Sequence, residues 1–282
     1  MTSTSYGVII GSIAVGLFLA THAYPAEPTD NLFLSVAGGG EEQPGDDATA
    51  FGTVGFNWGI PVNHDSAPDE VGVGLQLGAD YTVREGGTEW GVTFGVFARR
   101  LPSFGEQRSA AAVLFDYHRT VHDADVWSLR PILGTTISDR DALGVTGVIS
   151  LRGDHRDGHC AEALERVMAF WTREWSQDLA TELDAGMEGS HVDEGVFGLS
   201  VVYALDENWD VTLSGEINTD AAYTTGLRFS YHFGGLRRHD SIHNIRGEGV
   251  GRFTPWPRRR GGIVNCGGAG DGFTPDGGGP TD

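Results

Sequence analysis

The sequence predicts an all-β protein, a transmembrane up-and-down antiparallel β-barrel of about 12 strands with a disordered C-terminal tail. Three observations predict it. Between residues 31 and 234, apolar residues alternate with small or polar ones in run after run, and period two is the strand period. The polar face is rich in Gly, Ser and Thr, which suits the crowded, wet interior of a closed barrel. Tryptophans stand at both ends of the runs, where a membrane barrel needs interfacial aromatic residues.

The first element is an export signal. Residues 6–20 are apolar but too few to span a bilayer comfortably, and the small residues Ala23 and Ala26 follow where a signal peptidase could cut. We therefore expect a signal peptide over residues 1–26. The first five residues carry no Lys or Arg, so an N-terminal anchor or a start codon placed too late stay open as alternatives.

Residues 27–234 are expected to form the barrel. The clearest runs lie at 71–83, 89–100, 142–152, 194–205, 208–218 and 224–233, and weaker runs lie at 31–39, 48–62, 109–121, 125–136, 164–175 and 179–187. Only residues 161–175 compete as a helix, because their alternation is not clean. Their length and flanks favour a strand. A soluble β-sandwich is the alternative architecture, in which the tryptophans would anchor the corners of a core.

Five tryptophans are assigned to the membrane interfaces: Trp58, Trp90, Trp127, Trp175 and Trp209. If both chain ends of the barrel lie in the periplasm, residues 153–163 and 189–194 point outward, while 176–178 and 206–208 are tight periplasmic turns. The segments 63–70 and 102–109 are also expected on the periplasmic side, although they are as long as outward loops.

The last run carries a candidate signal for the barrel-assembly machinery. A polar residue is followed two places on by Gly and then by alternating hydrophobic and aromatic residues, at Thr224, Gly226, Phe229 and Tyr231. A terminal strand of this kind pairs by its edge with the insertase and presents its apolar side to lipid. We therefore expect the barrel-assembly machinery and outer-membrane lipid as partners.

The chain also resembles a family. "DNLFLSVAGGGEEQPGD", "FGTVGFNWGIPV" and "VGVGLQLGADYT" are similar to the start of an uncharacterised, porin-like bacterial outer-membrane β-barrel family, a domain of unknown function. "VLFDYH", "SLRPILG" and "SDRDALGV" resemble its middle, and "RFTPWP" resembles its end. The resemblance implies a β-barrel in a bacterial outer membrane and brings no catalytic motif. The stretch from Arg258 onward departs from it, through a frameshift or a lineage-specific extension.

If the apolar faces meet lipid, a set of eight acidic and four basic residues lines the lumen. They are Asp80, Glu89, Arg99, Asp116, Arg130, Arg152, Glu182, Asp184, Glu188, Asp210, Glu216 and Arg228. A wet lumen with this bias concentrates cations and excludes anions. The alternative is that these charges are paired and stabilise a narrow, plugged interior. The abundant glycine on the lumen face favours an open bore.

No chemistry is expected. The "HRDGHC" segment contains His155, His159 and Cys160, but their spacing fits no helix or strand face, and we predict a surface loop without a metal. A barrel phospholipase would need a Ser–His pair, for which no signature is present. We expect no enzyme, no catalytic residue and no cofactor. Cys160 and Cys266 are expected not to form a structural bridge.

Residues 235–282 form a Gly-, Arg- and Pro-rich flexible tail with seven Arg against five acidic residues, a formal charge of +2. It could plug the acidic lumen, bind anionic partners or remain solvated. The formal net charge of −20 for the whole chain argues against nucleic acid as a partner. The function expected is passive, cation-leaning passage of small solutes. The alternatives are a closed, structural outer-membrane barrel and a soluble exported β-protein.

Overall fold

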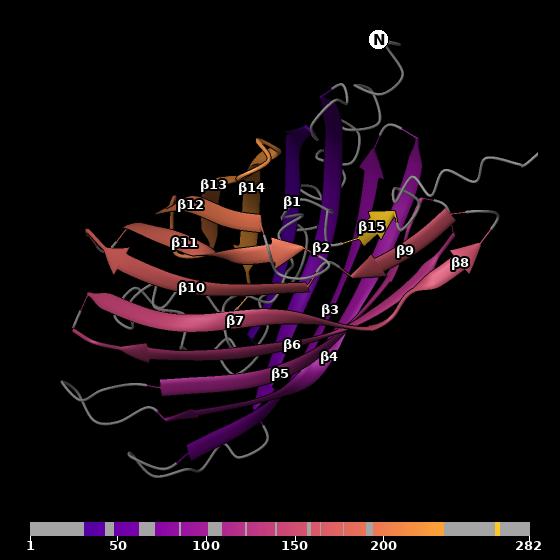
Figure 1. Cartoon of the computed structure of the whole chain (residues 1–282). Helices are drawn as coiled ribbons and strands as arrows, with labels where there is room; N and C mark the ends of the chain where they lie inside the picture. The colour runs from indigo at the N-terminus through magenta and orange to yellow at the C-terminus, as the bar shows by residue number, and fades with distance from the viewer. Residues whose placement is uncertain are drawn as a thin grey trace, which may run out of the picture.

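The computed structural model describes residues 31–42, 48–61, 71–84, 86–100, 109–121, 123–138, 140–156, 159–163, 165–176, 178–189, 194–233 and 263–265. They contain a closed antiparallel barrel of 12 strands (Figure 1). Its strands are β1 (Asn31–Glu42), β2 (Thr49–Pro61), β3 (Val71–Arg84), β4 (Gly87–Arg100), β5 (Ser109–Arg119), β6 (Asp125–Thr136), β7 (Asp141–Arg152), β10 (Glu165–Glu174), β11 (Leu179–Gly189), β12 (Glu194–Ala204), β13 (Trp209–Asn218) and β14 (Tyr223–His232). The predicted all-β barrel is confirmed, and the region with weak alternation forms strand β10.

Consecutive barrel strands pair with one another, and β1 closes the wall by pairing with β14. The four residues of the candidate assembly signal lie on this closing strand. Thr224 is paired with Glu41, Gly226 with Gly39, Phe229 with Val36 and Tyr231 with Leu34. Thr224 is buried, whereas Phe229 and Tyr231 lie on the outer face. The strand that the sequence singled out is therefore the one that completes the barrel.

The barrel has two ends, which we name by the chain termini. The terminal end is where β1 begins and β14 ends, and the far end is the opposite one. Four-residue turns at 137–140, 175–178 and 205–208 join neighbouring strands at the terminal end. The predicted tight turns therefore share one end with the two chain ends of the barrel. At the far end, β3 and β4 are joined by two residues, and Gly86 has a φ of 95°, which such a tight hairpin requires.

Burial is inverted relative to a soluble protein. On β3, the outward side chains of Val73, Leu75, Leu77 and Tyr81 are exposed. The inward residues between them, including Gln76 and Asp80, are buried. The same alternation runs around the wall, so the apolar surface is outside and the polar surface is inside, as in an outer-membrane barrel. Among the residues described, no helix is long and apolar enough to cross a membrane.

A second, three-stranded sheet was not predicted. It consists of β8 (Asp154–Arg156), β9 (His159–Ala163) and β15 (Ile263–Asn265), in the order β15-β9-β8. The sequence predicted a surface loop for the first two strands and a tail without stable structure for the third. Strands of three to five residues are too short for alternation to reveal them. The predicted signal peptide and the rest of the tail lie outside the described residues.

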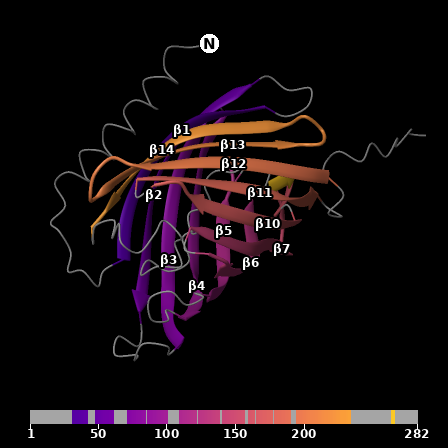
Figure 2. The same ribbon diagram turned by 90° about the vertical axis from the view of Figure 1, so that its left-hand side faces the viewer.

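The β8–β9 hairpin bends inward at the far end of the barrel. Ala163 of β9 is buried in an apolar cluster with Ala124 and Val126, against which Val148 packs. Val126 lies on the same inward face as Ser128, and Val148 lies on the inner face of β7. In two perpendicular views, the yellow strand β15 lies within the outline of the barrel wall (Figures 1 and 2). The far mouth is therefore partly covered from within.

Candidate functional site

The inner face of the wall gathers most of the charges assigned to the lumen. Alternate residues of every barrel strand turn to this face. Eight of the twelve assigned side chains are buried there: Asp80, Glu89, Asp116, Arg130, Asp184, Glu188, Asp210 and Glu216. Glu182 and Arg228 are half-buried on the same face. The structure thus brings ten of the twelve residues together inside one barrel.

Arg152 is the exception, and its lumen assignment is wrong. A bulge between Trp127 and Ser128 shifts the register of β6 against β7, so Arg152 is paired with Trp127 and is exposed. One extra residue in a strand moves every later side chain to the other face. The side chain of Arg99 lies outside the described part of the chain.

Sequence reasoning missed five further charges on the inner face: Glu41, Arg84, Arg166, Glu174 and Glu194. Arg84 continues the alternation of Asp80 and Thr82 by one more step, so extending that run by one residue would have found it. Arg166 and Glu174 lie in the run whose alternation is weakest. With them, the described inner face holds eleven carboxylates and four arginines.

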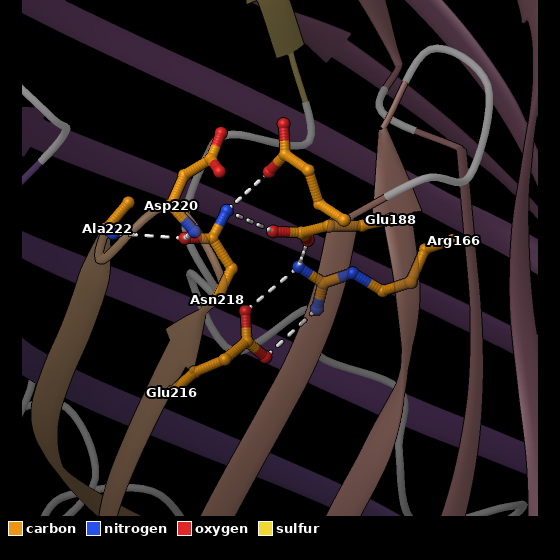
Figure 3. Close-up of polar contacts among 7 residues, drawn as sticks. Arg166, Glu188, Glu216, Asn218, Asp220 and Ala222 are labelled. Atoms are coloured by element: carbon orange, nitrogen blue, oxygen red, sulfur yellow. Dashed lines mark hydrogen bonds and ion pairs between the residues drawn. The ribbon is translucent and has the colours of Figure 1, made fainter.

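The largest polar cluster lies near the far end, on β10, β11, β12 and β13 (Figure 3). Arg166 donates from Nη1 and Nη2 to the two carboxylate oxygens of Glu216 at 3.0 and 2.9 Å, and Nη2 also contacts Glu188. This bidentate geometry is the strong form of the Arg–carboxylate bond. Asn218 donates to Glu188 and Glu194. One guanidinium therefore ties β10 to β13 across two intervening strands.

The same cluster also holds the turn between β13 and β14. Asn218 Oδ1 accepts hydrogen bonds from the backbone N–H groups of Asp220 and Ala222 at 3.1 and 3.0 Å, which holds the β13–β14 turn (Figure 3). Glu188 has no exposed surface and Glu216 is 8% exposed. Because buried charges are stable only when they are paired, the cluster depends on its single arginine.

A second cluster lies on β4, β5 and β6. Arg130 donates to both oxygens of Asp116, at 3.0 and 2.7 Å, and Thr93 Oγ1 donates to Asp116 at 2.6 Å. Near the far end of β1, β3 and β4, Arg84 pairs with Glu41 and, at 3.5 Å, with Glu89. In this part of the wall, each described arginine is held by carboxylates of neighbouring strands.

A third cluster lies near the terminal end. His232 Nε2 and Asp210 Oδ2 are 2.6 Å apart, and Ser230 is paired with Asp210 on the neighbouring strand. A hydrolytic relay needs the histidine between the serine and the acid, so that it can take the serine proton. Here the carboxylate stands in the middle. The arrangement holds β13 against β14 and does not activate Ser230.

Glycines on the inner face do not leave open space, contrary to the argument from composition. Six of them are paired with a large inward side chain of a neighbouring strand, which lies over the glycine: Gly39 with Phe51, Gly74 with Phe97, Gly91 with His118, Gly95 with Leu114, Gly144 with Phe170 and Gly186 with Met168. A Cβ on Gly74 or Gly144 would stand 2.1 Å from the ring of its partner. Glycine therefore lets bulky side chains lie flat along the wall.

The inner wall also carries an apolar patch. Phe97, Ala110, Ala112, Leu114 and Ile132 form one buried cluster on β4, β5 and β6, in the part of these strands nearer the terminal end. The carboxylates of the inner face lie outside this cluster.

The interfacial tryptophans fall into two groups. Trp90 and Trp127 lie near the far end and are linked through Tyr117, whose ring centroid is 5.1 Å from that of Trp90 and 4.8 Å from that of Trp127. Trp58, Trp175 and Trp209 lie near the terminal end. Trp171, which the sequence reading missed, joins them and donates to Asp141 at 3.1 Å.

Metal-ligand groups of three or more His, Cys, Asp or Glu are absent from the portion of the chain that the structure describes. The side chains of His155, His159 and Cys160 lie outside that portion. The clusters above are ion pairs and hydrogen bonds between strands.

Several solved structures are similar to this chain at low sequence identity. A chain from the structure described as "Unveiling the Mechanism Behind the in-meso Crystallization of Membrane Proteins" is 13% identical over 74% of this chain and 87% of its own, with a TM-score of 0.51. Outer membrane phospholipase A from Escherichia coli is 7% identical over 78% and 97%, with a TM-score of 0.47. The KdgM porin is 10% identical over 70% and 98%, with a TM-score of 0.43. The first likeness, at its low identity, concerns the fold alone.

No curated protein matches the chain. One family does, over residues 31–234, which begin with the first residue of β1 and end two residues after β14. The match therefore spans the whole barrel and stops where the tail begins. On this match the chain belongs to DUF6666, a family of unknown function.

Proposed function

We propose that this protein lies in a bacterial outer membrane and lets small solutes pass passively, with a preference for cations. The observation that carries the proposal is the charge of the described inner face, where eleven carboxylates stand against four arginines. A low-dielectric wall focuses the field of such charges into the lumen, raises the local concentration of cations and lowers that of anions.

Membrane placement follows from the outer face. Its large apolar side chains are exposed, including Leu133, Val167 and Leu213 at 56%, 59% and 58%. A soluble protein rarely exposes a continuous apolar belt of this kind. Tryptophans near both ends of the strands suit the two membrane–water interfaces. Lipid is the partner that covers this surface, and the closing strand β14 is the part that the barrel-assembly machinery would recognise.

The mechanism needs no bond to be made or broken. The polar clusters hold the strands in register, and the excess carboxylates exert the field. The grouping of Ser230, Asp210 and His232 does not support a barrel enzyme, because the acid and not the histidine lies between the other two. Passage is then limited by the width of the lumen and by its charge.

Planar-bilayer recording of the refolded full-length protein tests the proposal. We expect discrete conductance steps in a KCl gradient and a reversal potential of the sign that cation preference gives. Protein that is folded by its heat-shifted gel mobility but silent would contradict the proposal.

The second candidate is a closed structural barrel that anchors its loops in the membrane. The observation that favours it is the packing of Phe51, Phe97 and Phe170 over glycines, which places bulky side chains inside the wall. Silence of the folded protein would support this candidate.

A further inference from the structure

Two histidines turn to the inner face among the residues whose side chains the structure describes, and each lies beside an aspartate of another strand. His232 of β14 has its Nε2 atom 2.6 Å from Asp210 Oδ2 on β13. His118 of β5 faces Asp80 of β3 across Gly91 of β4, because Gly91 is paired with both of these residues. The interior therefore holds two histidine–aspartate pairs.

The second pair depends on the glycine between its members. A Cβ on Gly91 would stand 2.7 Å from His118 Nδ1 and 2.8 Å from Asp80 Oδ1, so both atoms lie directly over the glycine. A residue with a side chain at this position would fill the space that the imidazole and the carboxylate share. Glycine thus lets side chains of β3 and β5 approach each other across the intervening strand.

The two pairs are connected along one row of the wall. Successive cross-strand partners in this row are Asp210, Ser230, Ser35, Gly55, Asp80, Gly91 and His118. Both serines and both aspartates of the row are buried. His232 lies two residues beyond Ser230 on the same face of β14. The two imidazoles therefore act on neighbouring levels of the lumen.

We propose that the two histidine–aspartate pairs make the cation preference of the lumen depend on pH. This inference rests on the proposed function, since it concerns how that passage is regulated. Imidazole is the side chain that ordinarily changes its charge between pH 5 and 8. Proton uptake by His118 and His232 adds positive charge to an interior whose excess carboxylates attract cations.

The charge of the described inner face gives the size of the effect. With neutral imidazoles, eleven carboxylates and four arginines give a formal charge of −7. Two imidazolium groups change this charge to −5. Arginine keeps its proton throughout, and carboxylic acids ordinarily ionise near pH 4. Between pH 5.5 and 8.5 the change in interior charge is therefore assigned to the two imidazoles.

The charged groups around His118 are carboxylates. Asp80 faces it from β3, Glu89 lies on the inner face of β4, and Asp116 lies two residues away on β5 itself. On the other side, β6 turns Val126 to it, which carries no charge. A proton on His118 therefore meets negative charge on three strands, and no unpaired cation is buried.

The surroundings of His232 are more balanced. Asp210 faces it from β13, and Arg228 lies on the same face of β14. On the side of β1 its neighbour is Phe33, whose ring centroid is 5.3 Å from that of the imidazole. Asp210 is the carboxylate that pairs with an imidazolium at this position.

Reversal potentials of the refolded full-length protein in a KCl gradient test the proposal. We expect the permeability ratio of K⁺ to Cl⁻ to fall about twofold between pH 8.5 and 5.5, as the interior loses two of its seven net negative charges. The His118→Gln/His232→Gln variant, which has no imidazole in either pair, should keep the same ratio at both pH values. An unchanged ratio in the wild type, or an equal fall in the variant, would overturn the proposal.

Nuclear magnetic resonance of histidine-labelled protein reports the two imidazoles without any need for conductance. The signals of His118 and His232 are those missing from the spectra of the His118→Gln and His232→Gln single variants. We expect both signals to titrate between pH 5.5 and 8.5. Asp80→Asn should change the midpoint of His118 and leave that of His232 unchanged. Imidazoles that do not titrate in this range would overturn the proposal, whereas folded but silent protein would overturn the function on which it rests.

Discussion

The two halves of the barrel wall build their interiors differently. In β1–β6, the described inner face has four carboxylates and two arginines, and it carries the apolar patch around Phe97 and Leu114. In β7–β14 it has seven carboxylates and two arginines. The formal charge is thus −2 in the first half and −5 in the second. The contrast teaches that the first half mainly packs, while the second half sets the field that a solute meets.

Arg166 is the residue of the second half whose replacement should lower the free energy of unfolding most. Arg166→Met leaves Glu188 and Glu216 buried without their guanidinium, and we expect a loss of about 3–5 kcal/mol in the free energy of unfolding. Urea titration of the protein in lipid vesicles measures it. Arg119→Met is the matched control, because its ion pairs are at the outer rim and exposed, and it should unfold as the wild type does.

Removing the buried charges should also remove the need for Arg166. We expect the triple variant Arg166→Met/Glu188→Gln/Glu216→Gln to regain stability relative to Arg166→Met, since neutral amides cost less to bury than unpaired carboxylates. A triple variant no more stable than the single one would show that Arg166 acts through packing and not through its charge.

Glycine substitutions test whether wall packing is common to both halves. Gly95→Ala in the first half and Gly186→Ala in the second place a Cβ 2.3 and 2.0 Å from a backbone carbonyl oxygen of the neighbouring strand. We expect each to lower the free energy of unfolding by about 2 kcal/mol through overpacking. Gly215→Ala is the control, because its nearest contact is at 3.9 Å. A control as unstable as the other two would contradict the packing argument.

Neutralising carboxylates of the second half should weaken cation preference without unfolding the barrel. We expect the reversal potential of the Glu182→Gln/Asp184→Asn variant to move toward zero, because both residues lie on the inner face. Asp123→Asn removes an exposed carboxylate at the outer rim and should leave the reversal potential unchanged. An equal shift in both variants would mean that the inner face does not set the selectivity.

Raising the salt concentration should have the smallest effect on cation preference, and it should act on every charge of the inner face. The Debye length falls from about 10 Å at 0.1 M to about 3 Å at 1 M, so the field of the wall reaches less far into the lumen. We expect the cation preference to decline over this range in the wild type. In the Glu182→Gln/Asp184→Asn variant it should decline less. A preference independent of salt would indicate a narrow binding site and not a field.

The sequence predicted on which face of a strand a side chain lies better than it predicted which side chains of neighbouring strands are in contact. Period-two alternation predicted the inner face for Asp80, Glu188 and Glu216, and the structure has them buried there, because one face of each strand is apolar and the other polar. It failed for Arg152, where a bulge changed the register, since a bulge leaves no mark in a single strand's pattern. It also missed Arg166, which lies where alternation is weakest.

Contacts between strands could not be read from the sequence, because they depend on register. Phe97 lies over Gly74 only because these two residues are paired. In the same way, β9 and β15 share three residue pairs, which are too few for a pattern in the sequence to reveal. These pairs nevertheless bring together residues that are about one hundred positions apart in the chain. The fold class and the sign of the interior charge were predictable, whereas the filling of the interior was not.

The most direct test of the central claim, an acidic interior open to small cations, is the reversal potential of the refolded full-length protein in a KCl gradient. We predict conductance steps that reverse at a potential of the cation-selective sign. Folded protein that is silent, or that reverses at the potential of an anion-selective pore, would contradict the claim.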